Sequence, residues 1–279
     1  MIVIGDDNYQ DFLPGGFKSP SRHHYGLTPR DYTRDPVGSS EYAQPFDEVF
    51  PLIPREEWPE RIADMKGTKS RLSDIYRQEA LDQNGQGFCW AYSSAACWHA
   101  LNALAGGEPT RLSPHAIACI IYNYQDRGAW GKVSFDYMVK NGCPSEEYWP
   151  QQSMRRSNDT PEMRADMAKH RFTEGYVDLN PPHPADANLT EDQQMSVLLS
   201  GLPMVGDHNW WGHSICQLDP VDMNPSLGQQ GLNDPNRWGR LIVNSWGRSW
   251  SENGFGILKG RKGIADGGLA PRAITIVGS

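Results

Sequence analysis

The sequence predicts an α+β protein of two subdomains, because a segment with helical periodicity precedes a segment of short strands. The chain of 279 residues is long enough for one large domain or two small ones. Between Cys89 and Ala105, apolar residues recur at helical spacing, whereas after Gly201 short apolar runs alternate with turn residues. We therefore expect a helical subdomain at about residues 80–185 and a β-rich subdomain at about residues 186–279.

The first 50 residues have a different composition from the rest of the chain. Gly, Pro, Asp and Arg interrupt them, and they lack apolar periodicity, so we predict an extended N-terminal arm (residues 1–50) ahead of a folded domain (residues 51–279). The arm also carries aromatic residues such as Phe12 and Tyr25, which a solvated linker rarely needs. We expect the arm to lie along its own domain or along a neighbouring chain.

Within the expected domain, capping residues and turns delimit the elements. Trp58 is expected to be buried in the core. After the helix from Cys89, further helices are expected from Ser113 as N-cap, over 133–139, from Thr160 to about Arg171, and from a capping box at Thr190–Gln193 to Gly201. Strands are expected at 203–205, 214–218, 241–244, 255–258 and 273–277, with a long polar connection at 219–239.

Composition excludes several classes of protein and function. Hydrophobic residues make up 38% of the chain, enough for a core, and the net charge is −8. An acidic chain of this kind argues against binding to nucleic acid or to an anionic membrane surface. No apolar run approaches the roughly 18 residues that a membrane helix needs. The N-terminal residues lack the basic and apolar regions of an export signal, so we expect a cytoplasmic protein.

The five cysteines are expected to be free thiols. Their number is odd and no Cys-x-x-Cys pair occurs, which removes the usual zinc and thioredoxin patterns. Cys89 is the exceptional one, because it begins the expected helix. The positive end of a helix dipole lowers the pKa of a thiol and favours the thiolate. This observation alone favours a small buried hydrophobic residue at Cys89 over a functional thiol.

Two further segments carry side chains that suit catalysis. His213 begins a predicted strand between small residues, and Asn244 ends another strand just before Trp246. An amide beside an imidazole can fix the orientation and tautomer of the ring. His208 is a second candidate for the imidazole. A metal site at His208 and His213 is not expected, because their spacing fits no helix face and no third ligand follows.

Together, these segments resemble the papain family of cysteine peptidases. His213 and Asn244 lie 124 and 155 residues after Cys89, close to the roughly 130–150 residues that separate the corresponding family segments. The resemblance covers about residues 52–279. It rests on three segments, which are Gln83…Gly87-Phe88-Cys89-Trp90-Ala91-Tyr92-Ser93, Gly212-His213-Ser214 and Asn244-Ser245-Trp246-Gly247.

The resemblance implies a papain-like two-subdomain fold, with a helical half and an antiparallel, barrel-like β half, and a role for each of five residues. Cys89 is the nucleophile, and His213 forms an ion pair with it and protonates the leaving amine. Asn244 holds the ring of His213, and Trp246 shields that contact from water. Gln83 lends its side-chain N–H to an oxyanion hole. The implied substrate is a peptide or protein, and no cofactor or metal is needed.

The sequence also departs from the family pattern. Gln86 stands where the family commonly has a bridging cysteine, and residues 1–50 lack the helical, charged pattern of a propeptide. We therefore do not expect a conventional zymogen. The arm is instead expected to dock on a partner in a larger assembly, which could be a virus particle. The connection at 219–239 could form a lid or a docking surface.

Three functions remain open from the sequence. A peptidase is the leading interpretation. The same residues could pass the acyl group to an amine, as in a transpeptidase or transglutaminase-like transferase. A catalytically silent protein that keeps the fold as a structural or docking component is the third.

Overall fold

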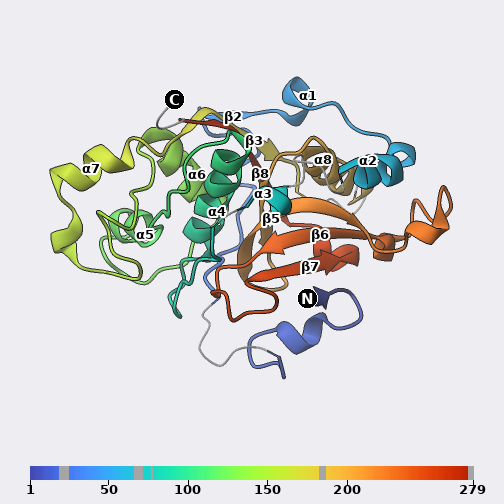
Figure 1. Cartoon of the computed structure of the whole chain (residues 1–279), viewed down its shortest axis with the longest axis horizontal. Coiled ribbons are helices and arrows are strands. Elements are labelled where there is room, and N and C mark those ends of the chain that lie inside the picture. Colours follow the sequence, from blue (N-terminus) through green and yellow to red (C-terminus); the bar gives the residue numbers. More distant parts are fainter. Residues whose placement is uncertain (19–24, 66–71, 77, 182–186, 276–279) are drawn as a thin grey trace.

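The computed structural model describes residues 1–18, 25–65, 72–76, 78–181 and 187–275, in which a helical half packs against a mixed sheet (Figure 1). The helices are α1 (Phe46–Val49), α2 (Trp58–Met65), α3 (Leu72–Ile75), α4 (Cys89–Leu104), α5 (His115–Ile121), α6 (Gly131–Lys140), α7 (Pro161–Met167) and α8 (Ala187–Leu199). The strands are β1 (Ile2–Ile4), β2 (Ala43–Gln44), β3 (Phe172–Leu179), β4 (Met204–His208), β5 (His213–Asp222), β6 (Trp238–Val243), β7 (Phe255–Lys259) and β8 (Gly267–Ile274). This arrangement confirms the expected α+β fold class.

The long helix α4 lies between the sheet and helices α5 and α6, whereas α2 and α8 pack on the sheet from elsewhere (Figure 1). Every residue from Cys89 to Asn102 is buried, as expected from a helix rich in Ala, Ser and Trp on all faces. Its apolar side chains join the largest core cluster, together with side chains from α5, α6, β3 and β5. The N-terminus of α4 is thereby held at the junction of the helical half and the sheet.

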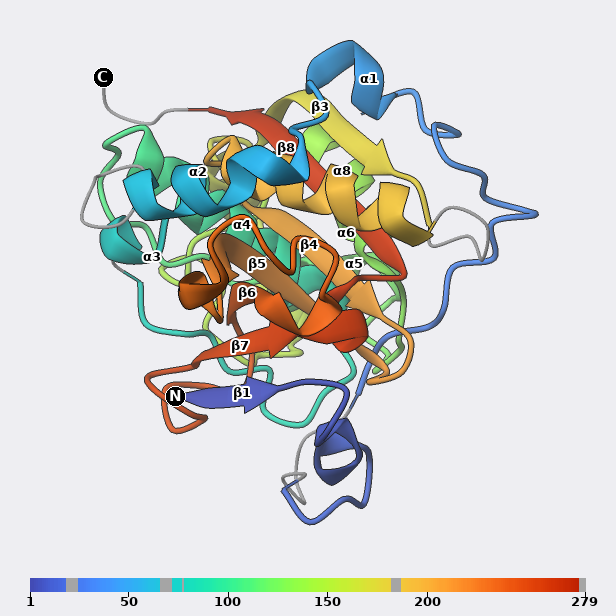
Figure 2. The same ribbon diagram turned by 90° about the vertical axis from the view of Figure 1, so that its right-hand side faces the viewer.

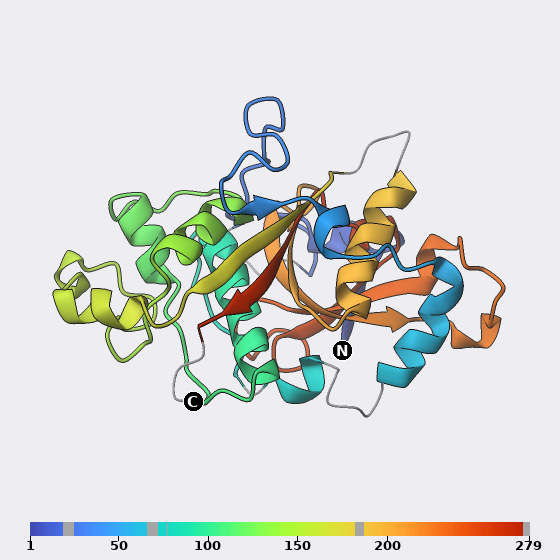
Figure 3. The same cartoon turned by 90° about the horizontal axis from the view of Figure 1, so that it is seen from above.

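The eight strands form one sheet in the order β1-β7-β6-β5-β4-β8-β3-β2. The internal pairs are antiparallel, whereas the two edge strands β1 and β2 pair in parallel with β7 and β3. Strands β3 and β8 run side by side across the middle of the molecule, drawn in yellow and red in Figure 3. The β3–β8 pair therefore connects the helical half with the rest of the sheet.

Several expected boundaries differ in the structure. Strand β3 lies within the range expected to be helical, and helix α8 lies within the range expected to be β-rich. Helix α7 ends at Met167 and not near Arg171, because β3 begins at Phe172. Thr160 does cap α7, since its hydroxyl accepts the Met163 N–H at 3.2 Å.

The two other expected N-caps are wrong. Ser113 does not cap α5, whose N-cap position is Pro114 with no side-chain hydrogen bond. Thr190 lies inside α8 and not before it, and its hydroxyl donates to the carbonyl of Pro181 at 3.2 Å. A hydroxyl that donates to a preceding carbonyl does not accept a hydrogen bond from an N–H group in the first turn of the helix. The Thr190–Gln193 pattern is therefore not a capping box.

The N-terminal arm lies along its own domain. Strand β1 adds to the edge of the sheet beside β7 (Figure 2), and β2 adds to the opposite edge. Ile4 and Phe12 are buried in an apolar cluster with Trp211 and Trp246. Phe17 is 94% exposed. A docking role of the arm toward another molecule stays a prediction.

None of the helices in the described ranges is long and apolar enough to cross a membrane. The 219–239 connection continues the β5–β6 hairpin and contains two short 3₁₀ turns, Pro225–Leu227 and Pro235–Arg237. Arg237 pairs with Asp222 at 2.8 Å and ties the base of this connection together.

Candidate active site

The sulfur of Cys89 lies at the N-terminus of α4 and is fully buried. Backbone N–H groups of Ser214 and Gly26 donate hydrogen bonds to it. Burial raises the pKa of Cys89 to about 12, and these two hydrogen bonds offset only part of that rise. The helix terminus was expected to favour a thiolate, but in this covered state the loss of solvation outweighs it.

His213 and Asn244 are brought together by adjacent strands, because β5 begins at His213 and Asn244 directly follows β6. The His213 Nε2 lies 2.7 Å from the Asn244 Oδ1. The same amide oxygen accepts the Ser245 N–H at 2.8 Å, which sets the orientation of the Asn244 side chain. An acceptor at Nε2 puts the ring proton there, so Nδ1 is the nitrogen that can take up a proton.

Aromatic rings surround the imidazole of His213. The ring of Trp246 lies 4.7 Å from it between centroids, and that of Trp211 lies 5.0 Å away. Tyr25 of the arm meets the same imidazole edge to face at 6.2 Å. These rings exclude water from the His213–Asn244 hydrogen bond, which strengthens it in the local low dielectric.

Gln83 connects the loop before α4 to the sheet half of the site. Its backbone N–H donates to the carbonyl of Ser245 at 2.9 Å, and its side-chain oxygen accepts the Ser245 hydroxyl at 2.6 Å. Its amide nitrogen donates one hydrogen to the carbonyl of Gln86 at 2.6 Å. The amide carries a second hydrogen, and the role of an oxyanion donor would fall to that one.

The arm passes directly over Cys89, which the sequence did not predict. The N–H of Leu27 donates to the carbonyl of Gly212 at 3.1 Å, next to His213. The carbonyl of Gly26 accepts the Ala129 N–H at 3.0 Å, and the Thr28 N–H donates to the Ala129 carbonyl at 3.0 Å. Residues 25–28 therefore bridge the two walls of the site by backbone hydrogen bonds, one wall from each half.

Gly26 makes this crossing sterically feasible. A Cβ on Gly26 would lie 2.1 Å from the carbonyl oxygen of Gly87, a contact that no side chain can make. The loop carrying Gly87 is held in turn by Asp126, whose carboxylate accepts the Gly87 N–H at 2.7 Å. This bond supports the loop in a chain whose five cysteines are all free.

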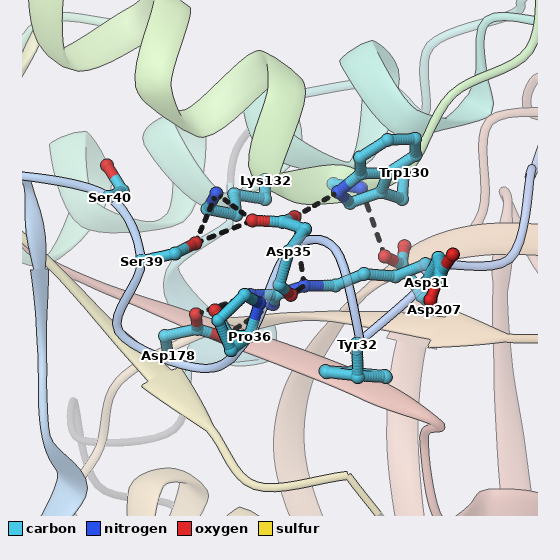
Figure 4. A network of polar contacts seen from close by, with 12 residues as sticks. Asp31, Tyr32, Asp35, Pro36, Ser39, Ser40, Trp130, Lys132, Asp178 and Asp207 are labelled. Carbon is cyan, nitrogen blue, oxygen red and sulfur yellow. Dashed lines mark hydrogen bonds and ion pairs between the residues drawn. The ribbon is translucent and has the colours of Figure 1, made fainter.

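Further along, the arm is anchored by ion pairs beyond the site. Arg30 donates to both oxygens of Asp178 on β3, at 2.8 and 2.9 Å. Asp35 accepts hydrogen bonds from Lys132 and from the indole of Trp130, on and just before α6 (Figure 4). These contacts join the arm to the helical half and to the sheet at once.

A carboxylate beside the nucleophile was also missed from the sequence. Asp207 on β4 pairs in register with Ser214, whose N–H bonds the sulfur of Cys89. One oxygen of Asp207 accepts the Gly131 N–H at 3.0 Å. Burial raises the pKa of Asp207 to about 6. The expected strand ends at Val205, whereas β4 continues to His208 and buries Asp207.

His208 does not compete with His213 as the base. It is fully buried, and burial lowers its pKa to about 3, so its ring is neutral and points away from solvent. Its Nε2 lies 3.3 Å from the amide nitrogen of Gln217. Within the described ranges, no group of three or more His, Cys, Asp or Glu side chains is arranged to hold a metal ion.

Comparison with known proteins adds to this geometry. A sequence profile of the family described as "Papain family cysteine protease" matches residues 70–272. Zingipain-1 of Zingiber officinale is 25% identical over 183 residues, which cover 62% of this chain and 78% of that protein. Cathepsin K of Mus musculus is 24% identical over 219 residues, which cover 76% of this chain and 64% of that protein.

Solved structures show the same fold. The structure of procathepsin L2 from the larval midgut of Tenebrio molitor aligns with a TM-score of 0.61 at 18% identity, covering 96% of this chain and 83% of that one. Bromelain from Ananas comosus in complex with the inhibitor E64 aligns with a TM-score of 0.55 at 19% identity, covering 73% and 97%.

Proposed function

Because this chain belongs to the papain family of cysteine proteases, we propose that it hydrolyses peptide bonds with Cys89 as the nucleophile and His213 as its acid–base partner. Asn244 orients His213, and Trp246 protects their contact from water. Gln83 and the backbone N–H of Cys89 stabilise the oxyanion. The observation that carries the proposal is the 2.7 Å hydrogen bond from His213 Nε2 to the amide oxygen of Asn244. The residue after His213 is Ser214, whose backbone N–H bonds the sulfur of Cys89.

The chemistry follows from these positions. The proton of Cys89 passes to Nδ1 of His213, and the thiolate attacks the carbonyl carbon of the scissile bond. The charge on the carbonyl oxygen is met by the donors of the oxyanion hole. The amine leaves with the proton from His213, and a thioester remains on Cys89. Water then attacks the thioester, giving its proton to His213 and releasing the acid.

The arm keeps this resting state closed. Cys89 has no solvent exposure, so a substrate reaches it only after residues 25–28 leave the site. In the closed state the thiol is neutral at physiological pH, since its pKa is raised to about 12 by burial. This supports a latent peptidase whose activity depends on displacement of its own arm, a form of control that the sequence did not predict.

Cys89→Ala and Asn244→Ala test the catalytic roles in a peptide-library digest of the arm-displaced protein. We expect Cys89→Ala to abolish cleavage, and Asn244→Ala to lower kcat by roughly a hundredfold, since a misoriented base loses most of its contribution. Cys119→Ala is the matched control, because Cys119 is another buried thiol, on α5. Equal cleavage by the Cys89→Ala and native proteins would refute the proposal.

One observation also favours the alternative of a catalytically silent protein, namely the raised pKa of the covered thiol. Iodoacetamide labelling at pH 6 separates the two. A latent peptidase labels selectively at Cys89 once the arm is displaced, whereas in a silent protein Cys89 stays as inert as the other four cysteines. Transferase activity would appear in the same digest as products joined to an added amine.

A further inference from the structure

Two buried carboxylates of the folded domain face the arm next to the candidate active site. Asp178 on β3 has a side chain with no solvent exposure. Within the described ranges, each hydrogen bond to its carboxylate comes from the arm, two from the guanidinium of Arg30 and one from the Gly38 N–H at 3.0 Å. When the arm leaves, Asp178 loses these partners and becomes an uncompensated acidic group.

Asp207 is the second of these carboxylates. It is 6% exposed, its Oδ2 accepts the Gly131 N–H, and the side chain of Ser214 also hydrogen-bonds its carboxylate. The positive charge of Arg30 favours the ionised form of Asp207, and the charge of Asp207 opposes the thiolate of Cys89. A carboxylate offers about four acceptor sites, so Asp207 can accept further hydrogen bonds from a bound donor.

The order of contacts along the arm places this acidic region relative to the reaction. Tyr25 lies against His213 and Trp246, the next residue contacts Cys89, and Arg30 follows near the two carboxylates. The leaving amine of a substrate must depart on the side of the imidazole that protonates it. The carboxylates therefore lie on the other side, where the acyl part of a substrate would be bound.

We propose that Asp178 and Asp207 form an acidic subsite for a lysine or arginine side chain on the acyl side of the scissile bond. In the closed state, Arg30 of the arm occupies the position of that basic side chain. This inference rests on the proposed peptidase function and names its substrate class. A guanidinium supplies several donors in a planar fork; Arg30 uses that fork on Asp178 and acts on Asp207 through its charge.

Part of the space beside Asp207 is filled by the arm itself. Gly131 and Gly267 flank Asp207 and carry no side chains. The hydroxyl of Tyr32 from the arm fills part of this space, where it would lie 3.1 Å from a Cβ on Gly267 and donates to the Asp266 carbonyl at 2.9 Å. Figure 4 shows Tyr32, Asp178 and Asp207 in the same region as the arm loop that carries Asp35 and Pro36. Displacing the arm vacates the volume of both Arg30 and Tyr32.

Two matched peptidyl vinyl sulfone probes test the subsite on the full chain. One carries arginine and the other the neutral isostere citrulline, at each acyl-side position in turn, and intact mass reports the rate of Cys89 alkylation. The arm reduces both rates by the same factor, because each probe must wait for the same open state. The ratio of the two rates therefore measures the subsite alone.

At one position we expect the arginine probe to react at least roughly tenfold faster, the scale of one charge-assisted hydrogen bond. Asp207→Asn and Asp178→Asn should each bring that ratio to within about twofold of one, on the same scale. Asp126→Asn is the control, since it removes a charge near Gly87 but outside the subsite, and the ratio should persist. Arg30→Gln loosens the arm and should raise both rates while preserving the ratio.

A ratio near one at every position, with Cys89 still alkylated, overturns the subsite and leaves the peptidase proposal intact. A ratio that falls with Asp126→Asn but not with Asp207→Asn overturns it as well, since the selectivity then lies elsewhere. If neither probe alkylates Cys89 in the native chain or in Arg30→Gln, the proposed function fails and the subsite fails with it.

Discussion

Asp207 keeps an ionisable carboxylate where burial opposes its charge. Its pKa is raised to about 6 by loss of solvation, so ionisation in the folded state works against stability. A neutral side chain of similar shape would avoid this cost. A carboxylate retained at such a position is typical of a functional group, in keeping with the subsite proposed for it.

The pH dependence of stability tests this directly. The ordinary pKa of an aspartate is 3.8, and that of Asp207 is raised to about 6, so between these values the native state holds a proton that the unfolded state has lost. The contribution of Asp207 to stability therefore falls as the pH rises from about 4 to about 6. We expect Asp207→Asn to exceed the native protein in stability by up to about 3 kcal/mol at pH 7, with no difference near pH 4.

Urea denaturation at the two pH values measures this difference. Asp166→Asn serves as the comparison, because Asp166 is also buried and accepts the Ser145 N–H, far from the arm. A native protein as stable as Asp207→Asn at pH 7 would contradict the raised pKa.

At the residue scale, the sequence identified the catalytic candidates but not their surroundings. Cys89, His213 and Asn244 stand in short local motifs, whose order along the chain is readable without a structure. The pairing of Arg30 with Asp178 joins residues 148 positions apart, and no local pattern announces it. In the sequence, Gly26 is likewise indistinguishable from an ordinary loop glycine. Only the structure shows that its Cα packs against the backbone of Gly87.

At the element scale, the segment of residues 25–28 acts as a short strand laid across the site. Leu27 pairs in parallel with Ala129, and the flanking hydrogen bonds reach Gly212 on the opposite wall. Few backbone hydrogen bonds hold this segment, and segments of this kind open with lower free energy than the core. Its removal can therefore precede unfolding of the domain.

Gly26→Val should displace this segment. A side chain at position 26 cannot fit against Gly87. The substitution therefore raises the free energy of the closed state, and the open state becomes more populated. We expect Cys89 to react with iodoacetamide at least roughly tenfold faster at pH 7 than in the native chain. Phe17→Ala, in the same arm at an exposed position, should leave the labelling rate unchanged. A native-like rate in Gly26→Val would mean that residues 25–28 do not limit access.

Elements with a single strong pattern were predicted well, and elements that depend on distant partners were not. The helix from Cys89 has sustained apolar spacing and ends within one residue of its expected boundary. Strand β3 was missed because Glu174 and Gly175 interrupt its alternation at a bulge, and Asp178 within it reads as polar although it is buried. The start of α8 was misplaced because Thr190 matched a capping pattern that the tertiary structure does not use.

At the scale of the whole molecule, the arm is part of the core that supports the site. Phe12 packs in one cluster with Trp211 and Trp246, and its carbonyl accepts hydrogen bonds from the Trp211 indole at 3.2 Å and the Tyr25 hydroxyl at 3.0 Å. The same aromatic rings enclose His213. The packing of Phe12 is thus connected to the segment that covers Cys89.

Phe12→Ala should therefore expose Cys89 although it does not contact the sulfur. Replacing a buried phenylalanine with alanine costs about 3–5 kcal/mol of packing free energy. Because Phe12 belongs to the arm, we expect this loss to weaken the binding of the arm to the domain. We expect faster iodoacetamide labelling of Cys89 with a Tm lowered by only a few degrees, measured by mass spectrometry and calorimetry. A large drop in Tm with unchanged labelling below the transition would show that the arm unfolds only with the domain.

The five unpaired cysteines have a practical consequence for handling the protein. Thiol enzymes are handled in reductant, which keeps the nucleophilic sulfur from oxidising. In a protein stabilised by disulfides, the same reductant can also reduce those disulfides and lower the stability of the fold. In this chain hydrogen bonds such as that from Gly87 to Asp126 brace the loop. Dithiothreitol can therefore be present throughout purification and assay, because it keeps the Cys89 thiol reduced and there is no disulfide among the five cysteines for it to break.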